Sequence, residues 1–251
     1  MSKVYEAKLM SPISNRNMSF YEKYIKRLFD IICSLLVIVL LSPLLIVLAI
    51  MVKAKLGSPI IFTQDRPGLI SKNGKETIFK MYKFRTMTNQ KDKDGNLLSD
   101  DQRLTSFGKW LRSTSLDELP EAFNILNGTM SVIGPRPQLV KDLVFMSDEQ
   151  RKRHTAKPGL SGLAQVNGRN TISWKDKLNY DLEYISNVSL IKDIKIIFKT
   201  ISTALIKKEG ISQEGMETAE DYGDYLVRNN YISKLEYDEK IDLYKSILKD
   251  K

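Results

Sequence analysis

The stretch from Ile31 to Val52, IICSLLVIVLLSPLLIVLAIMV, has 22 residues and no charged side chain. A straight helix of this length would measure about 33 Å, against about 30 Å for the hydrocarbon core of a bilayer. A cleaved signal peptide does not fit, because the run begins 30 residues into the chain, is too long for an h-region and lacks a small-residue cleavage site. The sequence therefore predicts a segment that lies in lipid.

The flanks of this segment do not indicate a direction of crossing. A spanning helix usually has an excess of Lys and Arg on its cytoplasmic flank. Here each flank of 20 residues carries four: Arg16, Lys23, Lys26 and Arg27 before the segment, and Lys53, Lys55, Arg66 and Lys72 after it. Both ends are thus expected on the cytoplasmic side.

The middle of the segment contains Ser42-Pro43, and proline kinks a helix by removing a hydrogen bond and crowding the preceding turn. Ser42 is expected to bond a freed carbonyl one turn back. Two interpretations stay open on these residues: a helix-break-helix hairpin that enters and leaves by one face, or a kinked single-pass helix.

Composition excludes several protein classes. With 251 residues, 42% hydrophobic and 27% charged, the chain is neither collagenous nor disordered. The single cysteine, Cys33, excludes an internal disulfide, and the single histidine, His154, excludes a Cys/His zinc site. The net charge of +9 favours an anionic partner, such as nucleic acid, phosphorylated metabolites or an acidic membrane face. Any metal is expected on carboxylates or on the substrate.

Four regions follow from this patterning: a lead-in (1–30), the membrane segment (31–52), a catalytic domain (53–206) and an acidic C-terminal extension (207–251). Phe20, Tyr21 and Tyr24 in the lead-in are expected at the headgroup level. The domain contains a strand-like run from Pro59 into FTQDRPG and a second at Thr77–Thr86. Residues 89–103 are predicted to form a solvated, mobile loop, since their spacing does not match an EF-hand.

Two further helices are expected. Ile191–Leu205 is a basic amphipathic helix with an apolar stripe formed by Ile191, Ile194, Ile197, Phe198, Ile201 and Leu205. It lies either on the bilayer or on the domain core. The extension also has helical apolar spacing, and we expect it to pack on the domain or on a second subunit of a homodimer.

The segment Arg112 to Glu121, RSTSLDELPE, combines helix-start signals with three carboxylates. Ser115 and Glu118 match a capping box, and Leu116, Leu119, Phe123 and Leu126 form an apolar stripe. Asp117 and Glu118 are therefore expected in a first helical turn, away from the buried stripe. Acids in that turn are favoured by the helix dipole alone, so this pattern by itself also fits an ordinary helix start.

Nearby cations in the sequence favour a functional role for the two acids: Lys83, Arg85, Arg112 and Arg136. Such a set would place a carboxylate against an otherwise repulsive diphosphate. A carboxylate can also attack phosphorus to give an aspartyl phosphate, and Mg²⁺ can use a carboxylate as ligand while neutralising phosphates.

Two loops carry further arginines. In SVIGPRP (131–137) two prolines flank Arg136 and fix its backbone, which suits either a phosphate or a solvated turn. The glycine-rich run KPGLSGLAQVNGRN (157–170), with Arg169, suits either close backbone approach to a ligand or a structural turn cluster.

These blocks together resemble a known family, the monotopic phosphoglycosyl transferases of bacterial glycoconjugate assembly (bacterial sugar transferases of the PglC type). The resemblance runs from about Lys26 to Thr218 through KRLFDI, the Ser42-Pro43 break, FTQDRPG, YKFRTM, LSDDQRL, SLDELP, SVIGPRP, PGLSGLAQVNGRN and SQEGMETAE. It implies an α+β fold: a re-entrant membrane helix broken at Ser-Pro, interfacial helices, and a compact, helix-rich cytoplasmic domain with short strands, placed at the bacterial inner membrane.

The resemblance also implies the chemistry. Asp117 would attack the β-phosphorus of a UDP-sugar and expel UMP, and polyprenyl (undecaprenyl) phosphate would then take up the phosphosugar. Glu118 would assist through Mg²⁺ held with Asp117, or by positioning the acceptor. The phosphates would be held by basic residues, namely Lys83, Arg112, Arg136, Arg85 and Arg169. Relatives commonly use N-acetylated amino sugars, the partners include a lipid bilayer, and no nucleic acid is expected.

Two other classes of function compete with this enzyme. A membrane-tethered protein that binds nucleic acid or anionic lipid would bind less tightly as salt rises and would tolerate Asp117→Asn. A conventional glycosyltransferase would use the same substrates but release UDP.

Overall fold

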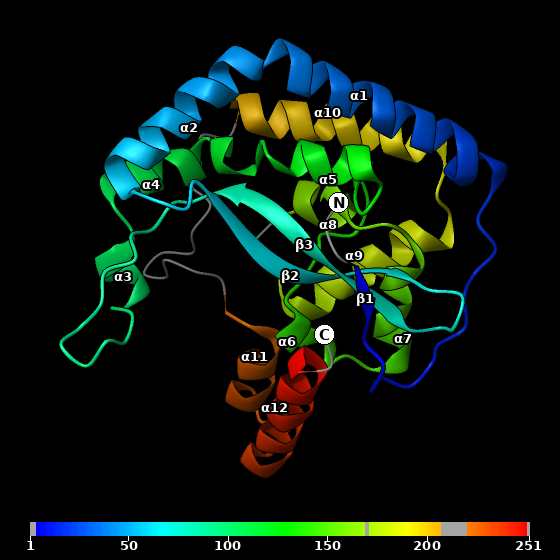
Figure 1. Cartoon of the computed structure of the whole chain (residues 1–251). Coiled ribbons are helices and arrows are strands. Elements are labelled where there is room, and N and C mark those ends of the chain that lie inside the picture. Colours follow the sequence, from blue (N-terminus) through cyan, green and yellow to red (C-terminus); the bar gives the residue numbers. More distant parts are fainter. Residues whose placement is uncertain (1–3, 169–170, 207–219, 250–251) are drawn as a thin grey trace.

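The computed structural model describes residues 4–168, 171–206 and 220–249 (Figure 1). Its mixture of helices and short strands confirms the predicted α+β class. The helices are η1 (Tyr21–Ile25), α1 (Lys26–Leu40), α2 (Ser42–Leu56), α3 (Asp100–Arg103), α4 (Ser106–Ser113), η2 (Leu116–Glu118), α5 (Glu121–Asn127), α6 (Val140–Leu143), α7 (Asp148–Arg151), η3 (Lys152–Thr155), α8 (Leu163–Val166), α9 (Trp174–Ser186), α10 (Leu190–Ile206), α11 (Tyr222–Arg228) and α12 (Lys234–Lys249). The strands are β1 (Tyr5–Glu6), β2 (Ile61–Ile70), β3 (Glu76–Phe84), β4 (Ser131–Ile133) and β5 (Gly159–Ser161).

Two small sheets organise the domain. Strands β2 and β3 form a long antiparallel hairpin, and β1 pairs with the other edge of β3, giving the order β1-β3-β2. Strands β4 and β5 pair in parallel. The two predicted strands are confirmed with shifted ends, while β1 falls in the lead-in, where no strand was predicted.

The membrane segment is a pair of helices, α1 and α2, bent by 64° at the break. Ser42 Oγ donates to the carbonyl of Val39 at 2.8 Å, which is the predicted bond to a carbonyl one turn back. No single helix in the described ranges is long and apolar enough to cross a bilayer, whereas the bent pair together meets that criterion by length and composition. In Figure 1 the pair arches over the domain, with α10 beneath it.

The start of α1 is fixed to the domain by charged side chains. Lys26 Nζ lies 2.5 Å from Asp193 Oδ2 on α10. Arg27 donates to the carbonyls of Ile125 and Leu126, both at 2.7 Å, at the end of α5. Since α5 has unpaired carbonyls at its C-terminus, Arg27 both neutralises that helix end and attaches α1 to it.

The end of α2 is fixed to the same domain. The buried Arg85 guanidinium donates to the carbonyls of Leu56 and, at 2.9 Å, of Ser58. Leu48 and Val52 are buried in a cluster that includes Phe84 and Leu111 of the domain. Both ends of the bent pair are therefore attached to one body.

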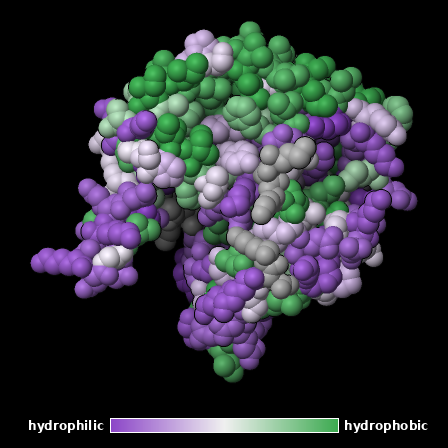
Figure 2. All heavy atoms as spheres, in the orientation of Figure 1, coloured by the Kyte–Doolittle hydropathy of each residue, from purple (hydrophilic) through white to green (hydrophobic). Residues whose placement is uncertain are grey.

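Helix α10 presents the predicted apolar stripe outward. Ile191, Ile194, Phe198 and Ile201 are exposed, whereas Asp193 and Ile196 are buried against the domain. Ile197, also part of the predicted stripe, is half-buried and packs on the cluster around Ile196, so most but not all of the stripe faces away from the core. Figure 2 shows apolar side chains gathered over α1 and α2 on the same side of the molecule, which favours the bilayer interpretation over core packing.

The described part of the extension packs on the domain, as predicted. Helices α11 and α12 bury Tyr222 and Ile247 in a cluster with Val140, Leu143 and Phe145. In Figure 1 they lie at the end of the molecule away from α1 and α2.

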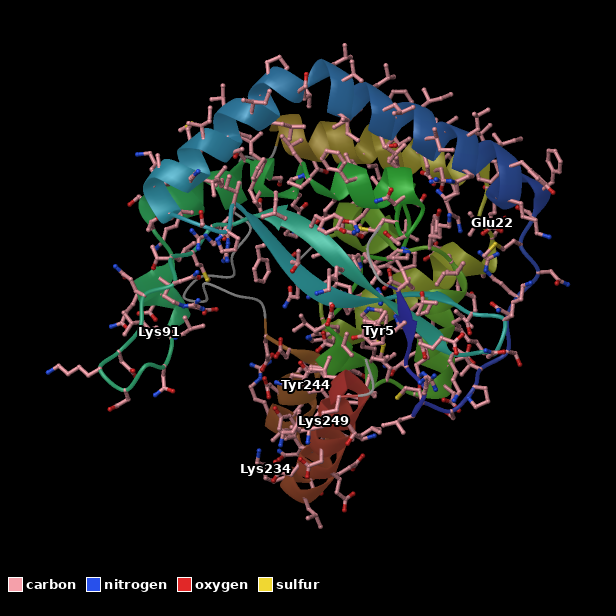
Figure 3. All side chains as sticks on the ribbon, in the orientation of Figure 1. Tyr5, Glu22, Lys91, Lys234, Tyr244 and Lys249 are labelled. Atoms are coloured by element: carbon pink, nitrogen blue, oxygen red, sulfur yellow. The ribbon has the colours of Figure 1, made fainter. Side chains whose placement is uncertain are left out.

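Residues 89–103 form the predicted exposed loop, and Figure 3 shows Lys91 on it, projecting away from the body. Its last residues differ from the prediction, because Asp100–Arg103 forms the short helix α3. Asp100 and Asp101 in its first turn and Arg103 in its last suit the helix dipole.

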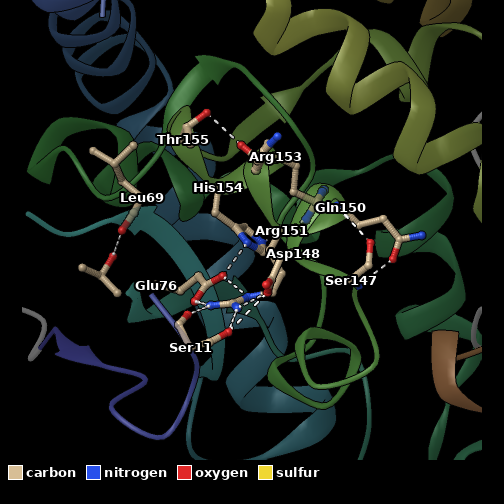
Figure 4. A network of polar contacts seen from close by, with 12 residues as sticks. Ser11, Leu69, Glu76, Ser147, Asp148, Gln150, Arg151, Arg153, His154 and Thr155 are labelled. Atoms are coloured by element: carbon tan, nitrogen blue, oxygen red, sulfur yellow. Dashed lines mark hydrogen bonds and ion pairs between the residues drawn. The ribbon is translucent and has the colours of Figure 1, made fainter. Parts of the chain in front are cut away.

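A buried ionic network links the lead-in, the sheet and α7 (Figure 4). Arg151 donates to both oxygens of Glu76, at 2.8 and 2.7 Å, and to Ser11. Burial disfavours the Glu76 carboxylate, but His154 and Arg151 outweigh it and lower its pKa to about 2. We attribute this mainly to Arg151, since His154 Nδ1 is 3.5 Å away and burial lowers the pKa of His154, which keeps the ring neutral. His154 is therefore structural.

We predict that the Glu76 carboxylate stabilises the fold at neutral pH and that this stabilisation is lost in acid. The pKa of Glu76 is 4.5 in the unfolded chain and about 2 in the folded protein. Its contribution to the free energy of unfolding is therefore fully present above pH 4.5 and is lost as the pH falls toward 2. Glu76→Gln should destabilise the protein by about 3 kcal/mol at pH 7, because it leaves the buried Arg151 with only the exposed Asp148 as an acidic partner. Unfolding of both proteins in detergent from pH 7 to 3 measures this, and a difference that stays constant over the range would contradict it.

We also predict that the extension contributes to stability through Ile247. This side chain is 1% exposed, so Ile247→Ala should cost about 2–4 kcal/mol. Leu235→Ala on the same helix is the matched control, since Leu235 is 72% exposed and its truncation should change stability by less than about 0.5 kcal/mol. Equal effects of the two substitutions on the thermal unfolding midpoint would show that α12 does not pack as described.

Candidate active site

Three stretches that are far apart in the sequence meet at the end of strand β3. Lys83 Nζ lies 2.7 Å from Glu118 Oε1 on η2 and 3.4 Å from Glu121 Oε1 on α5. Arg136, from the loop after β4, places its Nη2 2.6 Å from the same Glu118 oxygen. The structure thus brings together Lys83, Glu118 and Arg136 from the predicted site, with Asp117 adjacent in the chain.

The predicted capping box at Ser115 is wrong. Ser115 has a left-handed backbone, with φ of 55°, and its side chain caps no helix. This conformation costs a non-glycine residue about 1 kcal/mol and turns the chain sharply between α4 and η2. Asp117 and Glu118 therefore lie in a single 3-10 turn, and Pro120 starts the separate helix α5.

The predicted apolar stripe is also wrong in part. Phe123 is 42% exposed, and Ala122 and Ile125 are the buried apolar residues of α5. The reason is the break between η2 and α5, which rotates α5 relative to one continuous helix. As a consequence Asp117 is buried, only 7% exposed, instead of facing away from the core.

The turn that carries the two acids packs on the membrane helix pair. Leu116 and Leu119, on either side of the acids, join the apolar cluster of Leu48, Val52 and Leu56 from α2. Asp117 and Glu118 therefore lie on a turn whose leucines share an apolar cluster with α2, Phe84 and Leu111.

The Asp117 carboxylate is buried but unengaged. Burial raises the pKa of Asp117 to about 6. The positive charges of Lys83, Arg112 and Arg136 act to lower this pKa, and the negative charge of Glu118 acts to raise it. Among the residues that the structure describes, no hydrogen bond or ion pair holds this carboxylate. It is thus a buried carboxylate of raised pKa on which the positive charges of Lys83, Arg112 and Arg136 act.

The other two carboxylates differ sharply from each other. Burial opposes ionisation of Glu118, but Arg136 and Lys83 outweigh it and hold its pKa well below the usual range. Burial, together with the charge of Glu118, raises the pKa of Glu121 to about 7. Glu118 is therefore a fixed anion that orients the two cations, while Glu121 is a buried, weakly acidic neighbour.

A buried ion pair holds the backbone of the Arg136 loop. Arg153 on η3 donates to Asp181 Oδ2 on α9 at 2.9 and 2.6 Å and to the Arg136 carbonyl at 2.6 Å. The Arg153 and Asp181 side chains are 1% and 2% exposed. This pair fixes the loop from which Arg136 reaches Glu118.

Two of the described glycines in the run 157–170, Gly159 and Gly162, serve this same loop. A Cβ on Gly159 would lie 2.0 Å from the nitrogen of Gly134, and a Cβ on Gly162 would lie 2.1 Å from the Gly134 carbonyl oxygen. The close backbone approach is thus between β5 and the SVIGPRP loop, which favours the structural interpretation of Gly159 and Gly162.

The other predicted basic residues have different positions. Arg112 Nε donates to Thr86 Oγ1 at 3.0 Å, and its charge acts on Asp117. Arg85 is an anchor for the end of α2, and its guanidinium is occupied by the carbonyls described above. Arg169 lies outside the described residues.

Sequence reasoning missed several residues that shape the site. Glu121 was visible in the sequence as the third acid of RSTSLDELPE. Arg66 of FTQDRPG is close enough for the charges of Arg136 and Glu121 to act on it, and burial lowers its pKa to about 10. Asn124 accepts from the Tyr82 amide at 2.9 Å and donates to the Lys80 carbonyl at 2.8 Å, which fixes α5 to β3 beside Lys83. Asp181 carried no sequence signal.

The donor set suits a magnesium ion shared with a substrate. No cluster of three Asp, Glu, His or Cys side chains suited to a metal occurs within the described ranges. The unengaged Asp117 carboxylate and Glu118 Oε2, which makes no bond to a described residue, offer hard oxygen donors. Mg²⁺ typically takes one or two carboxylates together with phosphates, so this pair fits such an ion.

Comparison with known proteins gives consistent matches. The bacterial sugar transferase family matches residues 21–207. An uncharacterised sugar transferase of Bacillus subtilis is 43% identical over 79% of this chain and 95% of the relative. A UDP-glucose:undecaprenyl-phosphate glucose-1-phosphate transferase of Klebsiella pneumoniae is 44% identical over 79% of this chain. A UDP-N-acetylgalactosamine-undecaprenyl-phosphate N-acetylgalactosaminephosphotransferase of Aeromonas hydrophila is 38% identical over 72%.

The matches cover 43% of the Klebsiella protein and 44% of the Aeromonas protein, so the chain spans less than half of either. The family match nevertheless includes the bent helix pair, strands β2 to β5, the turn with Asp117 and Glu118, and the Arg136 loop. The chain belongs to the bacterial sugar transferase family.

Proposed function

We propose that the chain transfers a sugar 1-phosphate from a UDP-sugar to polyprenyl (undecaprenyl) phosphate and releases UMP. The proposed path runs through a phosphosugar bound covalently to Asp117, and the reaction would be the first membrane step of bacterial glycoconjugate or exopolysaccharide assembly. Support comes from the relatives named for sugar phosphate transfer to undecaprenyl phosphate. Family membership favours this enzyme over the alternative of a membrane-tethered binding protein.

One observation carries the covalent step: Asp117 is a buried, basic carboxylate without an ion pair, while the adjacent Glu118 is bonded to both Lys83 and Arg136. Burial strips the Asp117 carboxylate of water, and the nearby cations attract a diphosphate to it. A carboxylate whose role was only to fix a helix end would not be held in this way.

In the proposed reaction an Asp117 oxygen forms a bond to the β-phosphorus, and the bond from that phosphorus to the oxygen bridging to the α-phosphorus breaks. UMP leaves with the bridging oxygen. A phosphate oxygen of the lipid acceptor then attacks the same phosphorus, forming the diphosphate of the product and releasing the Asp117 carboxylate. Lys83, Arg112 and Arg136 stabilise the charge on the phosphoryl oxygens in both steps.

We assign Mg²⁺ to Asp117 and Glu118 together with the diphosphate of the substrate. The ion would supply charge neutralisation when bound. The orienting work stays with the protein, because Glu118 Oε1 is bonded to Lys83 and Arg136, and Oε2 would remain to hold the ion.

The membrane arrangement is proposed to be re-entrant, at the bacterial inner membrane with the catalytic domain in the cytoplasm. The attachment of both ends of the bent pair to one domain supports this, because a spanning pair would separate its ends by a bilayer. The position of Leu116 and Leu119 against α2 keeps Asp117 at the boundary between a water-borne and a lipid-borne substrate.

The sugar is proposed to be an N-acetylated amino sugar. The relative from Aeromonas hydrophila is named for N-acetylgalactosamine phosphate, which supports this class, while the relative from Klebsiella pneumoniae is named for glucose. A panel of UDP-sugars decides between them.

We predict that Asp117→Asn abolishes UMP release. The detergent-solubilised protein is incubated with Mg²⁺, a panel of UDP-sugars and polyprenyl phosphate, and the released nucleotide is identified. Without acceptor, intact-protein mass spectrometry should show one added phosphosugar on the wild type and none on Asp117→Asn. Release of UDP would indicate a conventional glycosyltransferase, and a single turnover without a protein adduct would exclude the covalent path.

Replacing Mg²⁺ by EDTA should stop UMP release, and returning Mg²⁺ should restore it, because the bare diphosphate repels the Asp117 and Glu118 carboxylates. Activity unchanged by EDTA would contradict the metal assignment.

We predict that Arg153 acts by positioning Arg136. Arg153→Lys keeps a positive charge beside Asp181 but removes the planar guanidinium group that also donates to the Arg136 carbonyl. We therefore expect kcat to fall about tenfold or more, while stability changes less than kcat does. Arg85→Lys is the matched control, since Arg85 is a buried arginine on backbone carbonyls away from that loop, and it should lower stability more than kcat. The opposite pattern in the two variants would contradict a positioning role.

A further inference from the structure

The start of the C-terminal extension contacts the segment that follows the Arg136 loop. The family match ends at residue 207, so α11 and α12 lie beyond it. Helix α6 begins at Val140, four residues after Arg136, and Figure 1 shows it beside α11 and α12. A segment outside the family match therefore meets the chain next to a residue of the proposed site.

One buried carboxylate joins the extension to this segment. Asp142 on α6 is 2% exposed. Its Oδ2 accepts from the Leu139 amide at 3.0 Å, and its Oδ1 accepts from the amide of Tyr222, the first residue of α11, at 2.8 Å. Burial raises the pKa of Asp142 to about 6, and the two amides act to lower it. Both amides thus stabilise the charged form of a carboxylate that water does not reach.

Lys141, the neighbour of Asp142, holds the same end of the extension. Its Nζ lies 3.0 Å from Asp221 Oδ2 and 3.3 Å from Asp224 Oδ2. These two acids lie on either side of Tyr222 in the chain. The ion pairs therefore help to keep the Tyr222 amide directed at Asp142.

The extension also contacts α9, a helix that helps to hold the Arg136 loop. Trp174 Nε1 on α9 donates to the Glu220 carbonyl at 3.1 Å. The same helix carries Asp181, whose partner Arg153 donates to the Arg136 carbonyl. The start of the extension is thus bonded both to the helix after the loop and to a helix that fixes the loop backbone.

The path from Asp142 back to Arg136 is short and stiff. Leu139, whose amide Asp142 holds, follows Arg136 by three residues. Pro135 and Pro137 fix φ on either side of Arg136. A displacement of Leu139 is therefore passed to the backbone of Arg136, because the residues between them have little freedom to absorb it.

We propose that the C-terminal extension positions the active-site Arg136. The Tyr222 amide holds Asp142, and Asp142 holds the backbone at Leu139. That backbone sets the direction from which Arg136 reaches Glu118. The effect on reaction rate rests on the proposed function, whereas the effect on the loop backbone does not.

The test compares two substitutions of one residue in the full-length protein. Tyr222→Pro removes the amide hydrogen, Tyr222→Ala keeps it, and both remove the phenol ring. Proline is favoured at the first position of a helix, and Asp221, with φ of −68° and ψ of 153°, already has the extended backbone required before proline. Helix α11 is therefore compatible with both variants, and their difference isolates the hydrogen bond to Asp142.

We expect kcat of Tyr222→Pro to be about fivefold or more below that of Tyr222→Ala, because a displaced Arg136 stabilises the phosphoryl charge less well. Backbone hydrogen exchange of residues 131–139, followed by mass spectrometry in detergent, should be faster in Tyr222→Pro than in Tyr222→Ala. Equal kcat values in two folded variants would overturn the proposal, because the extension would then only pack. A lower kcat with unchanged exchange of residues 131–139 would also overturn it.

A second pair of variants covers the case in which Tyr222→Pro does not fold. Lys141→Met removes the ion pairs beside the Tyr222 amide and should both speed exchange of residues 131–139 and lower kcat about twofold or more. Lys245→Met is the matched control, since Lys245 pairs with Asp242 on the surface of α12, and it should change neither. Equal effects of the two lysine variants would contradict the proposal.

The exchange measurement separates this proposal from the proposed function. If the wild type releases no UMP, the proposed function fails, and exchange of residues 131–139 then decides by itself. Faster exchange in Tyr222→Pro than in Tyr222→Ala would still show that the extension holds the loop, and equal exchange would overturn it.

Discussion

Two cations, Lys83 and Arg136, meet on one oxygen of Glu118, and the rest of the site depends on this contact. Lys83 comes from β3, Arg136 from the loop after β4 and Glu118 from the turn between α4 and α5. A fixed anion between two cations keeps three segments in register, and it leaves the adjacent Asp117 beside positive charge without a direct partner. The asymmetry between the two neighbouring acids is thus a consequence of geometry.

Buried polar groups around this contact hold its three segments. Asn124 replaces a strand partner on the open part of β3, and the Arg153–Asp181 pair holds the Arg136 carbonyl. Gly134 and Gly159 let the two loops approach at backbone distance. Because each of these groups is buried and bonded, satisfied polar contacts hold the three segments together.

The bent helix pair is attached to the same framework. Its start is held by Lys26 and Arg27, its end by Arg85, and its apolar face by Leu116 and Leu119 beside the acids. The domain therefore fixes how the apolar segment lies relative to Asp117. An apolar helix pair that was only tethered by a flexible linker would not hold the acids at a defined depth.

The sequence by itself determined the elements that depend on local pattern. The uncharged run with Ser42-Pro43, the β2–β3 hairpin, helix α10 and the family followed from residue order, because helix breaking, hydrophobic spacing and ordered motifs are properties of short segments. The sequence also identified Lys83, Asp117, Glu118 and Arg136 as candidates.

Only the tertiary structure decided how these elements meet. Ser115 was predicted to cap a helix, but it has a left-handed backbone between α4 and η2, and the separate break between η2 and α5 goes with a buried Asp117 and an exposed Phe123. Lys83 and Arg85 are only two positions apart, yet Lys83 meets Glu118 and Arg85 anchors α2. Partners such as Asp181 and Arg153 are separated by 28 positions in the chain, and only folding makes such a pair visible.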